Sequence, residues 1–143
     1  MQTAAHYDLI IVGGGPAGLC LARALAGSGL RLALVEPQTR EALLDPPFDG
    51  REIALTHHSV ELLTQLGVWA GIPPDQIHPL CDARILDGQG MVQEFTISHR
   101  DGRRSQLGYL VANHWIRRAA MAAVASQPEV DLWTGLRCVQ ARS

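Results

Sequence analysis

The sequence predicts an α/β fold that opens with a strand, a helix and a second strand, and three observations support this prediction. A short apolar run over residues 7–12 leads into a cluster of glycines, which is typical of a strand buried in a parallel sheet. Residues 16–28 carry apolar side chains at helical spacing, and Gly29 stands where a helix commonly ends. Residues 31–35 then alternate toward Glu36 as a second strand. Because a crossover helix joins the two strands, we expect them to pair in parallel.

After this unit the sequence predicts a series of shorter elements. Residues 37–50, rich in proline and acidic groups, are expected to form an irregular connection to an apolar run over residues 53–55. A helix is predicted over residues 57–66, because Thr56 is a good N-cap and Gly67 a good end. The remaining predictions are, in chain order, a loop over residues 71–79, a β-hairpin with strands 84–86 and 91–97 around a turn at 87–90, a strand over 108–111, a helix from Asn113 to about Ser126, and strands over 130–133 and 137–140.

Composition limits the kind of protein to which this fold belongs. The chain has 143 residues, 47% hydrophobic and 18% charged, with a formal net charge of −2, which is ordinary for one globular domain. It lacks the excess of positive charge of a general nucleic-acid binder. Its three cysteines lie far apart, so a disulfide framework or a zinc site is not indicated, and a cytoplasmic setting is expected. His57 and His58 are adjacent and cannot share one helix face, so we expect no metal site there.

The run GGGPAG at residues 13–18 matches the pattern G-x-G-x-x-G between the first predicted strand and the first predicted helix. In that context Gly13 permits the tight turn, Gly15 lets the backbone approach a pyrophosphate, and Gly18 lets the helix and strand pack closely. The positive end of the helix dipole then faces the phosphates. The residues expected to bind the pyrophosphate are Gly13, Gly15, Pro16, Ala17 and Gly18.

The acidic partner of this glycine run is expected about twenty residues further on, at the end of the second strand, and Glu36 stands there. A carboxylate at this place accepts a hydrogen bond from a ribose 2′-hydroxyl, so an adenosine without a 2′-phosphate is expected. The ligand is therefore FAD or NAD. The alternative is that the glycines form a plain turn and that Glu36 is a solvated strand end.

A resemblance to known families distinguishes between these two dinucleotides. Residues 46–55, PPFDGREIAL, followed by LLTQLGVW at residues 62–69, resemble the aromatic hydroxylases of ubiquinone biosynthesis, which are related to para-hydroxybenzoate hydroxylase. Within that family FDGREIAL is most similar to the 2-octaprenyl-6-methoxyphenol hydroxylases. The wider glycine pattern resembles the Rossmann-like FAD-binding fold of the glutathione-reductase type at Gly13, Gly15, Gly18, Ala22, Leu25, Gly29, Leu32, Leu34 and Glu36.

The resemblance implies two further cofactor contacts. Arg51 matches an arginine that in this family lies beside the phosphate and ribose of FAD; without the motif it would be a solvent-exposed charge at a strand tip. Asn113 matches a polar position that in relatives contacts the FAD ribose, and it is equally suited to be a helix N-cap. Ala112 departs from several relatives, which carry Glu there, so a contact through that carboxylate is absent.

The resemblance covers most of the chain but only the N-terminal part of such an enzyme. It implies that residues 1–143 are an incomplete FAD-binding domain with a small β-hairpin insertion, that the substrate domain and a later Gly-Asp motif are absent, and that the segment alone is inactive and prone to self-association. No catalytic residue is identified within it.

The function implied by the resemblance is hydroxylation of a polyprenyl phenol in ubiquinone biosynthesis. The full-length protein would be an FAD-dependent monooxygenase that uses NAD(P)H as electron donor together with O2. Such an enzyme is expected in the cytoplasm, in peripheral contact with the inner membrane or with a ubiquinone-biosynthesis complex. Two alternatives remain open, an NAD-binding dehydrogenase and a noncatalytic dinucleotide-binding module.

Overall fold

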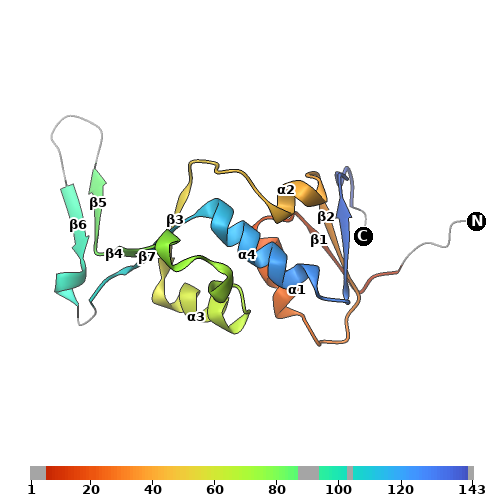
Figure 1. Cartoon of the computed structure of the whole chain (residues 1–143), viewed down its shortest axis with the longest axis horizontal. Coiled ribbons are helices and arrows are strands. Elements are labelled where there is room, and N and C mark those ends of the chain that lie inside the picture. The colour runs from red at the N-terminus through yellow and green to blue at the C-terminus, as the bar shows by residue number, and fades with distance from the viewer. Residues whose placement is uncertain (1–5, 87–93, 103–104, 142–143) are drawn as a thin grey trace, which may run out of the picture.

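The computed structural model describes residues 6–86, 94–102 and 105–141, and its core is a three-stranded parallel sheet. The strands are β1 (Leu9–Val12), β2 (Leu32–Glu36) and β8 (Val130–Thr134), in the order β1-β2-β8 (Figure 1). Leu34 lies opposite Ile11 on one side and Leu132 on the other. The parallel pairing of the first two strands, predicted from the sequence, is confirmed.

Two helices cover one face of this sheet, α1 (Pro16–Ala24) and α4 (Asn113–Ala125). Leu19 of α1, Met121 of α4 and Leu34 of β2 belong to one apolar cluster and are 0% exposed. Burying one such side chain contributes about 2 kcal/mol to folding. This layer of two helices on a sheet fixes the end of β1 against the start of α1.

The first helix is shorter than the sequence indicates. It was expected to continue to Ser28, but α1 ends at Ala24. Gly27 and Gly29 have φ angles of +73° and +79°, in the left-handed region that a right-handed helix cannot contain. The chain therefore leaves the helix one turn before the glycine that was expected to end it.

A second sheet is antiparallel and has the order β3-β7-β4. Its strands are β3 (Glu52–Thr56), β7 (Gly108–Ala112) and β4 (Ile77–Leu80). The last of these overturns the prediction of a loop over residues 71–79. Pro79 obscured the strand in the sequence, but β4 is an edge strand, where a residue without an N–H is tolerated.

The helix α3 (His57–Gln65) follows β3, and Thr56 is its N-cap as predicted, because its Oγ1 accepts from the Ser59 amide at 3.1 Å. The described residues also include three short 3-10 helices, over Trp69–Gly71, Pro74–Gln76 and His99–Asp101.

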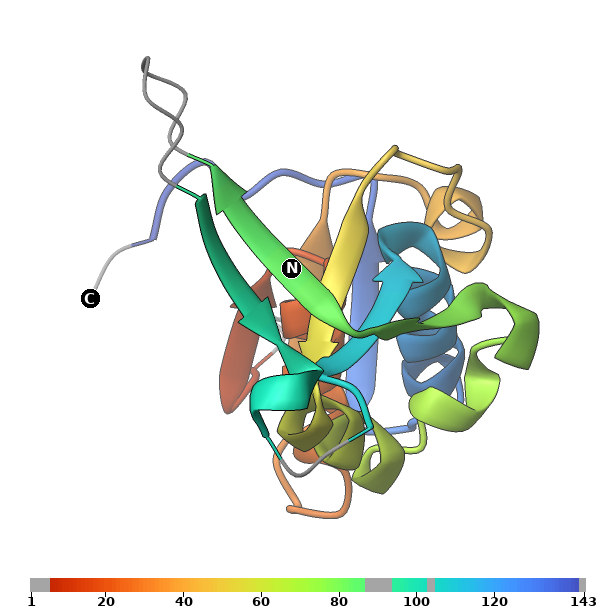
Figure 2. The same ribbon diagram turned by 90° about the vertical axis from the view of Figure 1, so that its left-hand side faces the viewer.

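The predicted hairpin is confirmed as the antiparallel pair β5 (Asp82–Leu86) and β6 (Glu94–Ser98). Its predicted turn at residues 87–90, and residues 91–93 of the second predicted strand, lie outside the described residues. The hairpin occupies the end of the molecule opposite the parallel sheet (Figure 1), and Figure 2 views the molecule from the hairpin end.

Two further predictions are wrong. The connection over residues 37–50 contains the helix α2 (Arg40–Leu44), whose N-cap Thr39 accepts from the Ala42 amide at 3.3 Å. One turn of helix is too short to show a period in the sequence. Residues 137–140 alternate as a strand does but form none, and Val139 is 92% exposed.

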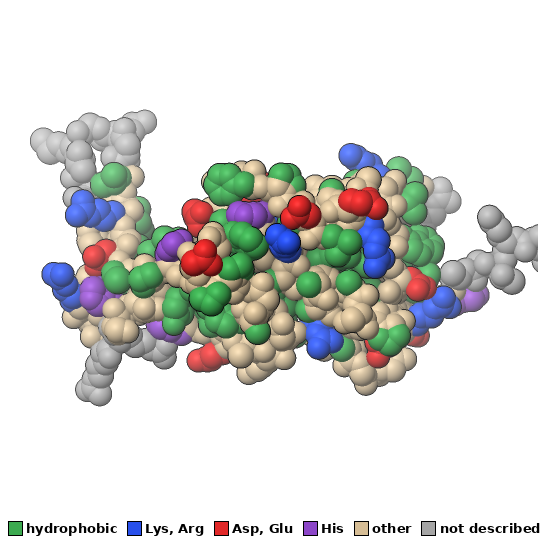
Figure 3. All heavy atoms as spheres, viewed as in Figure 1, with side chains coloured by type: hydrophobic (Ala, Val, Ile, Leu, Met, Phe, Trp, Pro, Cys, Tyr) green, Lys and Arg blue, Asp and Glu red, His purple; other side chains and the backbone are tan. Residues whose placement is uncertain are grey.

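The surface of the described residues carries charges of both signs, and one face of the parallel sheet exposes apolar side chains. On the face seen in Figure 3, acidic and basic side chains are interspersed rather than separated by sign. The face of the parallel sheet turned away from α1 and α4 exposes Ile10 (57%), Val12 (63%) and Trp133 (41%). Among the described helices, none has both the length and the hydropathy that a membrane span requires.

Candidate cofactor site

The glycine loop between β1 and α1 has the geometry that its sequence predicts. Gly13 has a φ angle of +112°, and its amide donates to the carbonyl oxygen of Val35 at 2.8 Å. A methyl group on Gly18 would collide with the carbonyl oxygen of Gly13, so only glycine allows helix and strand to approach this closely. A methyl group on Gly15 would meet no atom within 4 Å. The loop is therefore tight on its inner side and open at Gly15.

The start of α1 adds unpaired donors to this open side. The first amide to bond within the helix is that of Leu19, which donates to the carbonyl oxygen of Gly15 at 3.0 Å. Pro16 has no N–H, so Ala17 and Gly18 carry the amides that precede this first bond. A helix N-terminus beside an open backbone is suited to a phosphate. The protein thus leaves space and donors where the pyrophosphate of a dinucleotide is expected.

Glu36 lies against the glycine loop and is only 9% exposed, which contradicts the alternative of a solvated strand end. Its Oε2 accepts from the Gly14 amide at 2.6 Å, and its Oε1 accepts from the Gln38 amide at 3.0 Å. Each carboxylate oxygen keeps a second lone pair for another donor. The side chain is therefore held in place and still able to accept from a hydroxyl.

Arg51 and Asn113, from distant parts of the chain, meet at the carboxylate of Asp49. Its Oδ2 accepts from Arg51 Nη2 at 2.6 Å, from Arg51 Nε at 3.1 Å and from Asn113 Nδ2 at 2.7 Å. The Arg51 guanidinium, followed by the Asn113 amide, holds the pKa of Asp49 well below its usual range. The Arg51 side chain is 65% exposed and faces solvent, whereas the Asp49 side chain is 23% exposed.

The interpretation of Asn113 as a helix N-cap is wrong. The N-cap of α4 is Ala112, which has no side-chain oxygen, and Asn113 is the first helical residue. Its side chain turns to Asp49 and is almost completely buried, at 3% exposure of the residue. Its amide nitrogen donates to the carbonyl oxygen of Arg51 at 2.8 Å. Asn113 therefore joins the start of α4 to the PPFDGR segment.

Helix α4 connects the two halves of the site. Arg117 lies one turn after Asn113, and its Nη2 donates to Oε1 of Gln38 at 2.6 Å. Gln38 in turn donates its amide to Glu36. Sequence reasoning does not identify Asp49, Gln38 or Arg117. Asp49 and Gln38 lie in the segment that the sequence predicts as an irregular connection, where no local pattern marks a site.

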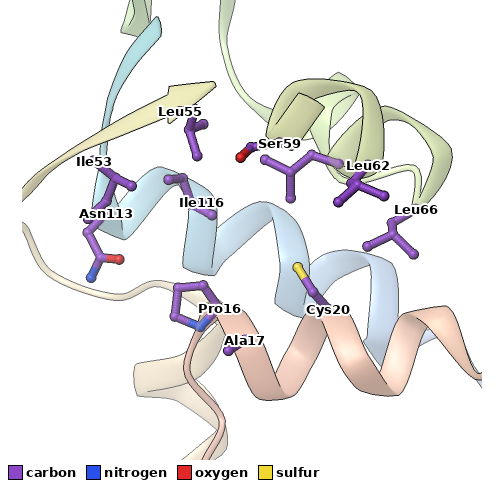
Figure 4. Close-up of a pocket in the computed structure, with 11 residues that line it drawn as sticks. Pro16, Ala17, Cys20, Ile53, Leu55, Ser59, Leu62, Leu66, Asn113 and Ile116 are labelled. Carbon is purple, nitrogen blue, oxygen red and sulfur yellow. The ribbon is translucent and has the colours of Figure 1, made fainter. Parts of the chain in front are cut away.

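An apolar pocket of about 600 Å³ opens beside these residues (Figure 4). Pro16 and Ala17 of α1 and Asn113 of α4 line one side of the pocket, so the pocket adjoins the candidate site. Burial raises the pKa of the Cys20 thiol in its wall. The remaining lining residues come from β3, α3 with its C-cap, and α4, and are Ile53, Leu55, Ser59, Leu62, Leu63, Leu66 and Ile116.

Comparison with known sequences identifies relatives over most of the chain. The model of the FAD binding domain family matches residues 6–129. The ubiquinone hydroxylase UbiM of Neisseria meningitidis is 46% identical over 132 residues, which are 90% of this chain and 29% of the relative. The ubiquinone hydroxylase UbiL of Rhodospirillum rubrum is 30% identical over 94% of this chain and 31% of the relative. The chain thus spans less than a third of the length of these relatives.

Solved structures share the fold. A mutant of PqsL from Pseudomonas aeruginosa superposes with a TM-score of 0.70 at 18% identity, over 96% of this chain and 36% of that one. The p-nitrophenol 4-monooxygenase PnpA of Pseudomonas putida superposes with a TM-score of 0.63 at 18% identity, over 89% of this chain and 31% of that one. These structures confirm the predicted fold class, an incomplete Rossmann-like FAD-binding fold.

Proposed function

Because the chain belongs to the FAD binding domain family, we propose that it is the N-terminal FAD-binding portion of a flavin monooxygenase that hydroxylates a polyprenyl phenol in ubiquinone biosynthesis. The relatives named ubiquinone hydroxylases support this proposal, since one of them is 46% identical over 90% of the chain. The PPFDGREIAL resemblance, at residues 46–55, agrees with it. NAD(P)H is the proposed electron donor.

One observation supports FAD binding most directly: the bond between Glu36 Oε2 and the Gly14 amide, which places an acceptor at the open glycine loop. In the proposed complex the backbone at Gly15 and the first turn of α1 bind the pyrophosphate. Glu36 accepts from the adenosine ribose, and Arg51 donates to phosphate. Bound FAD supplies the oxygen-activating redox chemistry. The contribution of this chain is then to bind and orient the adenosine and pyrophosphate.

The visible spectrum of the purified full-length protein tests the cofactor. We expect a yellow protein that releases FAD on denaturation. A colourless protein that binds NADH and cannot be reconstituted with FAD would favour the dehydrogenase alternative. A colourless protein that binds neither would contradict both enzymatic readings and favour another role.

The substrate class requires a second experiment, with a polyprenyl phenol, O2 and either NADPH or NADH. We expect hydroxylated phenol to accumulate in proportion to the NAD(P)H consumed. Hydrogen peroxide without hydroxylated product would indicate an oxidase instead. Because a polyprenyl phenol resides in the bilayer, we also propose a peripheral contact with the inner membrane, which cell fractionation tests by salt-sensitive sedimentation with membranes.

Replacing Arg51 with alanine in the full-length protein is expected to weaken FAD binding by about tenfold, since a charge-assisted bond to phosphate is lost. The measurement is titration of the apoprotein with FAD, followed by flavin fluorescence. Arg31→Ala is the control, because Arg31 also pairs with an aspartate, Asp131. Arg31 lies just before the start of β2, whereas Glu36, beside the glycine loop, is the last residue of that strand. Unchanged FAD affinity in Arg51→Ala would assign Arg51 to a solvent-exposed strand tip.

Residues 1–143 expressed alone are expected to self-associate, because Ile10 and Val12 form an exposed apolar face on an edge strand. Sedimentation velocity at increasing concentration should show this association, and Ile10→Thr combined with Val12→Thr should reduce it. Leu44→Thr, at an apolar residue of α2 that is 42% exposed, is the control. A monomer at all concentrations would contradict the expectation.

A further inference from the structure

Asp49 is the shared partner of two residues proposed to bind FAD. One oxygen of its carboxylate accepts three hydrogen bonds, two from Arg51 and one from Asn113. Arg51 and Asn113 are 62 positions apart in the sequence, and the bond from the Asn113 amide to the Arg51 carbonyl oxygen brings their backbones together without orienting their side chains. The single carboxylate gives both side chains one orientation.

The backbone around Asp49 is built to hold this arrangement. Its second oxygen, Oδ1, accepts from the Arg51 amide at 3.2 Å. This bond closes an Asx-turn between the side chain of Asp49 and the backbone of Arg51. Gly50, between them, has a φ angle of +74°, which glycine adopts without strain. Asp49 therefore binds the backbone of Arg51 with one oxygen and its guanidinium with the other.

The bonds to Asp49 leave a defined part of the guanidinium available. Asp49 takes the Nε hydrogen and one Nη2 hydrogen, and among the described residues no other acceptor is bonded to this group. A planar guanidinium has five N–H donors, so both Nη1 hydrogens and one Nη2 hydrogen point away from Asp49. This outer edge, formed by Nη1 and Nη2, can make a two-pronged contact with a phosphate.

The same carboxylate also determines which end of the Asn113 amide is free. A carboxylate only accepts, so the amide must present Nδ2 to Asp49, at 2.7 Å. Its carbonyl oxygen Oδ1 is then the end left to the site, and Asn113 lines the pocket that Pro16 and Ala17 also line (Figure 4). An acceptor at this place is suited to a hydroxyl of a ribose or ribityl chain.

We propose that Asp49 is a positioning residue for FAD: it directs the outer edge of Arg51 toward a phosphate and the carbonyl oxygen of Asn113 toward a sugar hydroxyl. This inference rests on the proposed function, because it takes FAD as the ligand. Asp49 itself does not touch the cofactor. Its negative charge opposes the attraction of Arg51 for phosphate, so its benefit is orientation and not charge.

The opposing contributions of charge and orientation give a test with a definite sign. Asp49→Asn removes the negative charge, and it places an amide nitrogen or a weaker acceptor against Arg51 and Asn113. If orientation dominates, the FAD dissociation constant of the full-length apoprotein rises by about tenfold. If Asp49 is only a counter-ion that competes with phosphate, the dissociation constant stays the same or falls, and the proposal is overturned.

Asp131→Asn is the matched control, since Asp131 also accepts from an arginine, Arg31 at 3.1 Å, but at the other end of the parallel strands. It should leave FAD affinity at the wild-type value. Asp49→Glu provides a second variant that keeps the charge and moves the oxygens by one methylene. It should weaken FAD binding as well, whereas wild-type affinity in Asp49→Glu would contradict a positioning role.

A combined variant separates positioning from a general effect on folding. In a background that already carries Arg51→Ala and Asn113→Ala, Asp49→Asn should cause no further loss of FAD affinity, because both side chains through which it acts are gone. A further loss of FAD affinity of similar size would mean that Asp49 acts through the stability of the fold and not through Arg51 and Asn113. If the wild-type protein itself binds no FAD, the proposed function fails; if it binds FAD and Asp49→Asn binds equally well, only this inference fails.

Discussion

Gly18→Ala is expected to lower the free energy of unfolding of the apoprotein by about 3 kcal/mol, the upper end of the cost of overpacking a close contact. The added methyl group would meet the carbonyl oxygen of Gly13, a backbone atom that cannot rotate away. Gly13 is itself fixed by its bond to Val35 and by a φ angle of +112°. Relief would require α1 to move off the sheet.

Gly15→Ala is the control for this substitution within the same loop. Gly15 has a φ angle of −74°, which alanine adopts freely, and a methyl group there meets no atom within 4 Å. The apoprotein should therefore melt as the wild type does. FAD affinity should fall strongly all the same, because the methyl group would enter the space proposed for the pyrophosphate. Thermal unfolding without FAD and FAD titration, carried out on both variants, separate the two effects.

The contrast between the two glycines can be contradicted in two ways. A Gly18→Ala apoprotein that melts at the wild-type temperature would mean that the loop relaxes at little cost. A Gly15→Ala protein with wild-type FAD affinity would place the pyrophosphate elsewhere.

Glu36→Ala is expected to reduce FAD affinity by about a hundredfold, since it removes a buried acceptor and leaves the Gly14 and Gln38 amides without their partner. The Gly14 amide is buried, and leaving a buried amide unpaired costs about 1–3 kcal/mol, so the loop should also lose stability. Glu36→Gln keeps one acceptor oxygen and should give intermediate values of both quantities. The measurements are FAD titration by flavin fluorescence and thermal unfolding of the apoprotein.

Glu129→Ala is the control for Glu36, because Glu129 also accepts from a glycine amide, that of Gly27 at 3.4 Å, at an exposed place away from the loop. It should change neither FAD affinity nor unfolding appreciably. Wild-type FAD affinity in Glu36→Ala would contradict the ribose contact. A fall in affinity without loss of stability would show that the two amides find water.

The sequence predicted the first unit of the fold because its signals are local. The glycines at residues 13–18, the helix period and Glu36 lie within thirty residues and describe one supersecondary unit, so the loop and the burial of Glu36 beside it follow from short-range geometry. The prediction for Asn113 was wrong because its partner is distant in the sequence. A polar residue at the start of a helix commonly caps it, and only the fold brings Asp49 within 2.7 Å of its amide.

The structure of the middle of the chain was predicted less well, again for physical reasons. Strand β4 pairs with β7, which comes later in the chain. Pro79 argues against a strand unless that strand lies at the edge of a sheet, and the sequence alone does not show this position. Helix α2 has five residues, fewer than two turns, so its apolar residues give no period. Both elements depend on tertiary context that no local pattern contains.

The sheet order β1-β2-β8 makes the core of this domain discontinuous in sequence. Strands β1 and β2 are adjacent in the chain. Strand β8 and the helix α4 before it come later in the sequence, after α3, the antiparallel sheet and the hairpin. Pairing between strands so far apart in the sequence raises the contact order, which slows folding. The segment between Glu36 and Asn113 leaves the parallel sheet but packs Leu43 and Val111 into the same apolar cluster. Near its two ends, the Asn113 amide donates to the carbonyl oxygen of Arg51 and the Asn113 side chain donates to Asp49. The residues of the candidate cofactor site thus also join the two ends of the segment that separates β2 from α4.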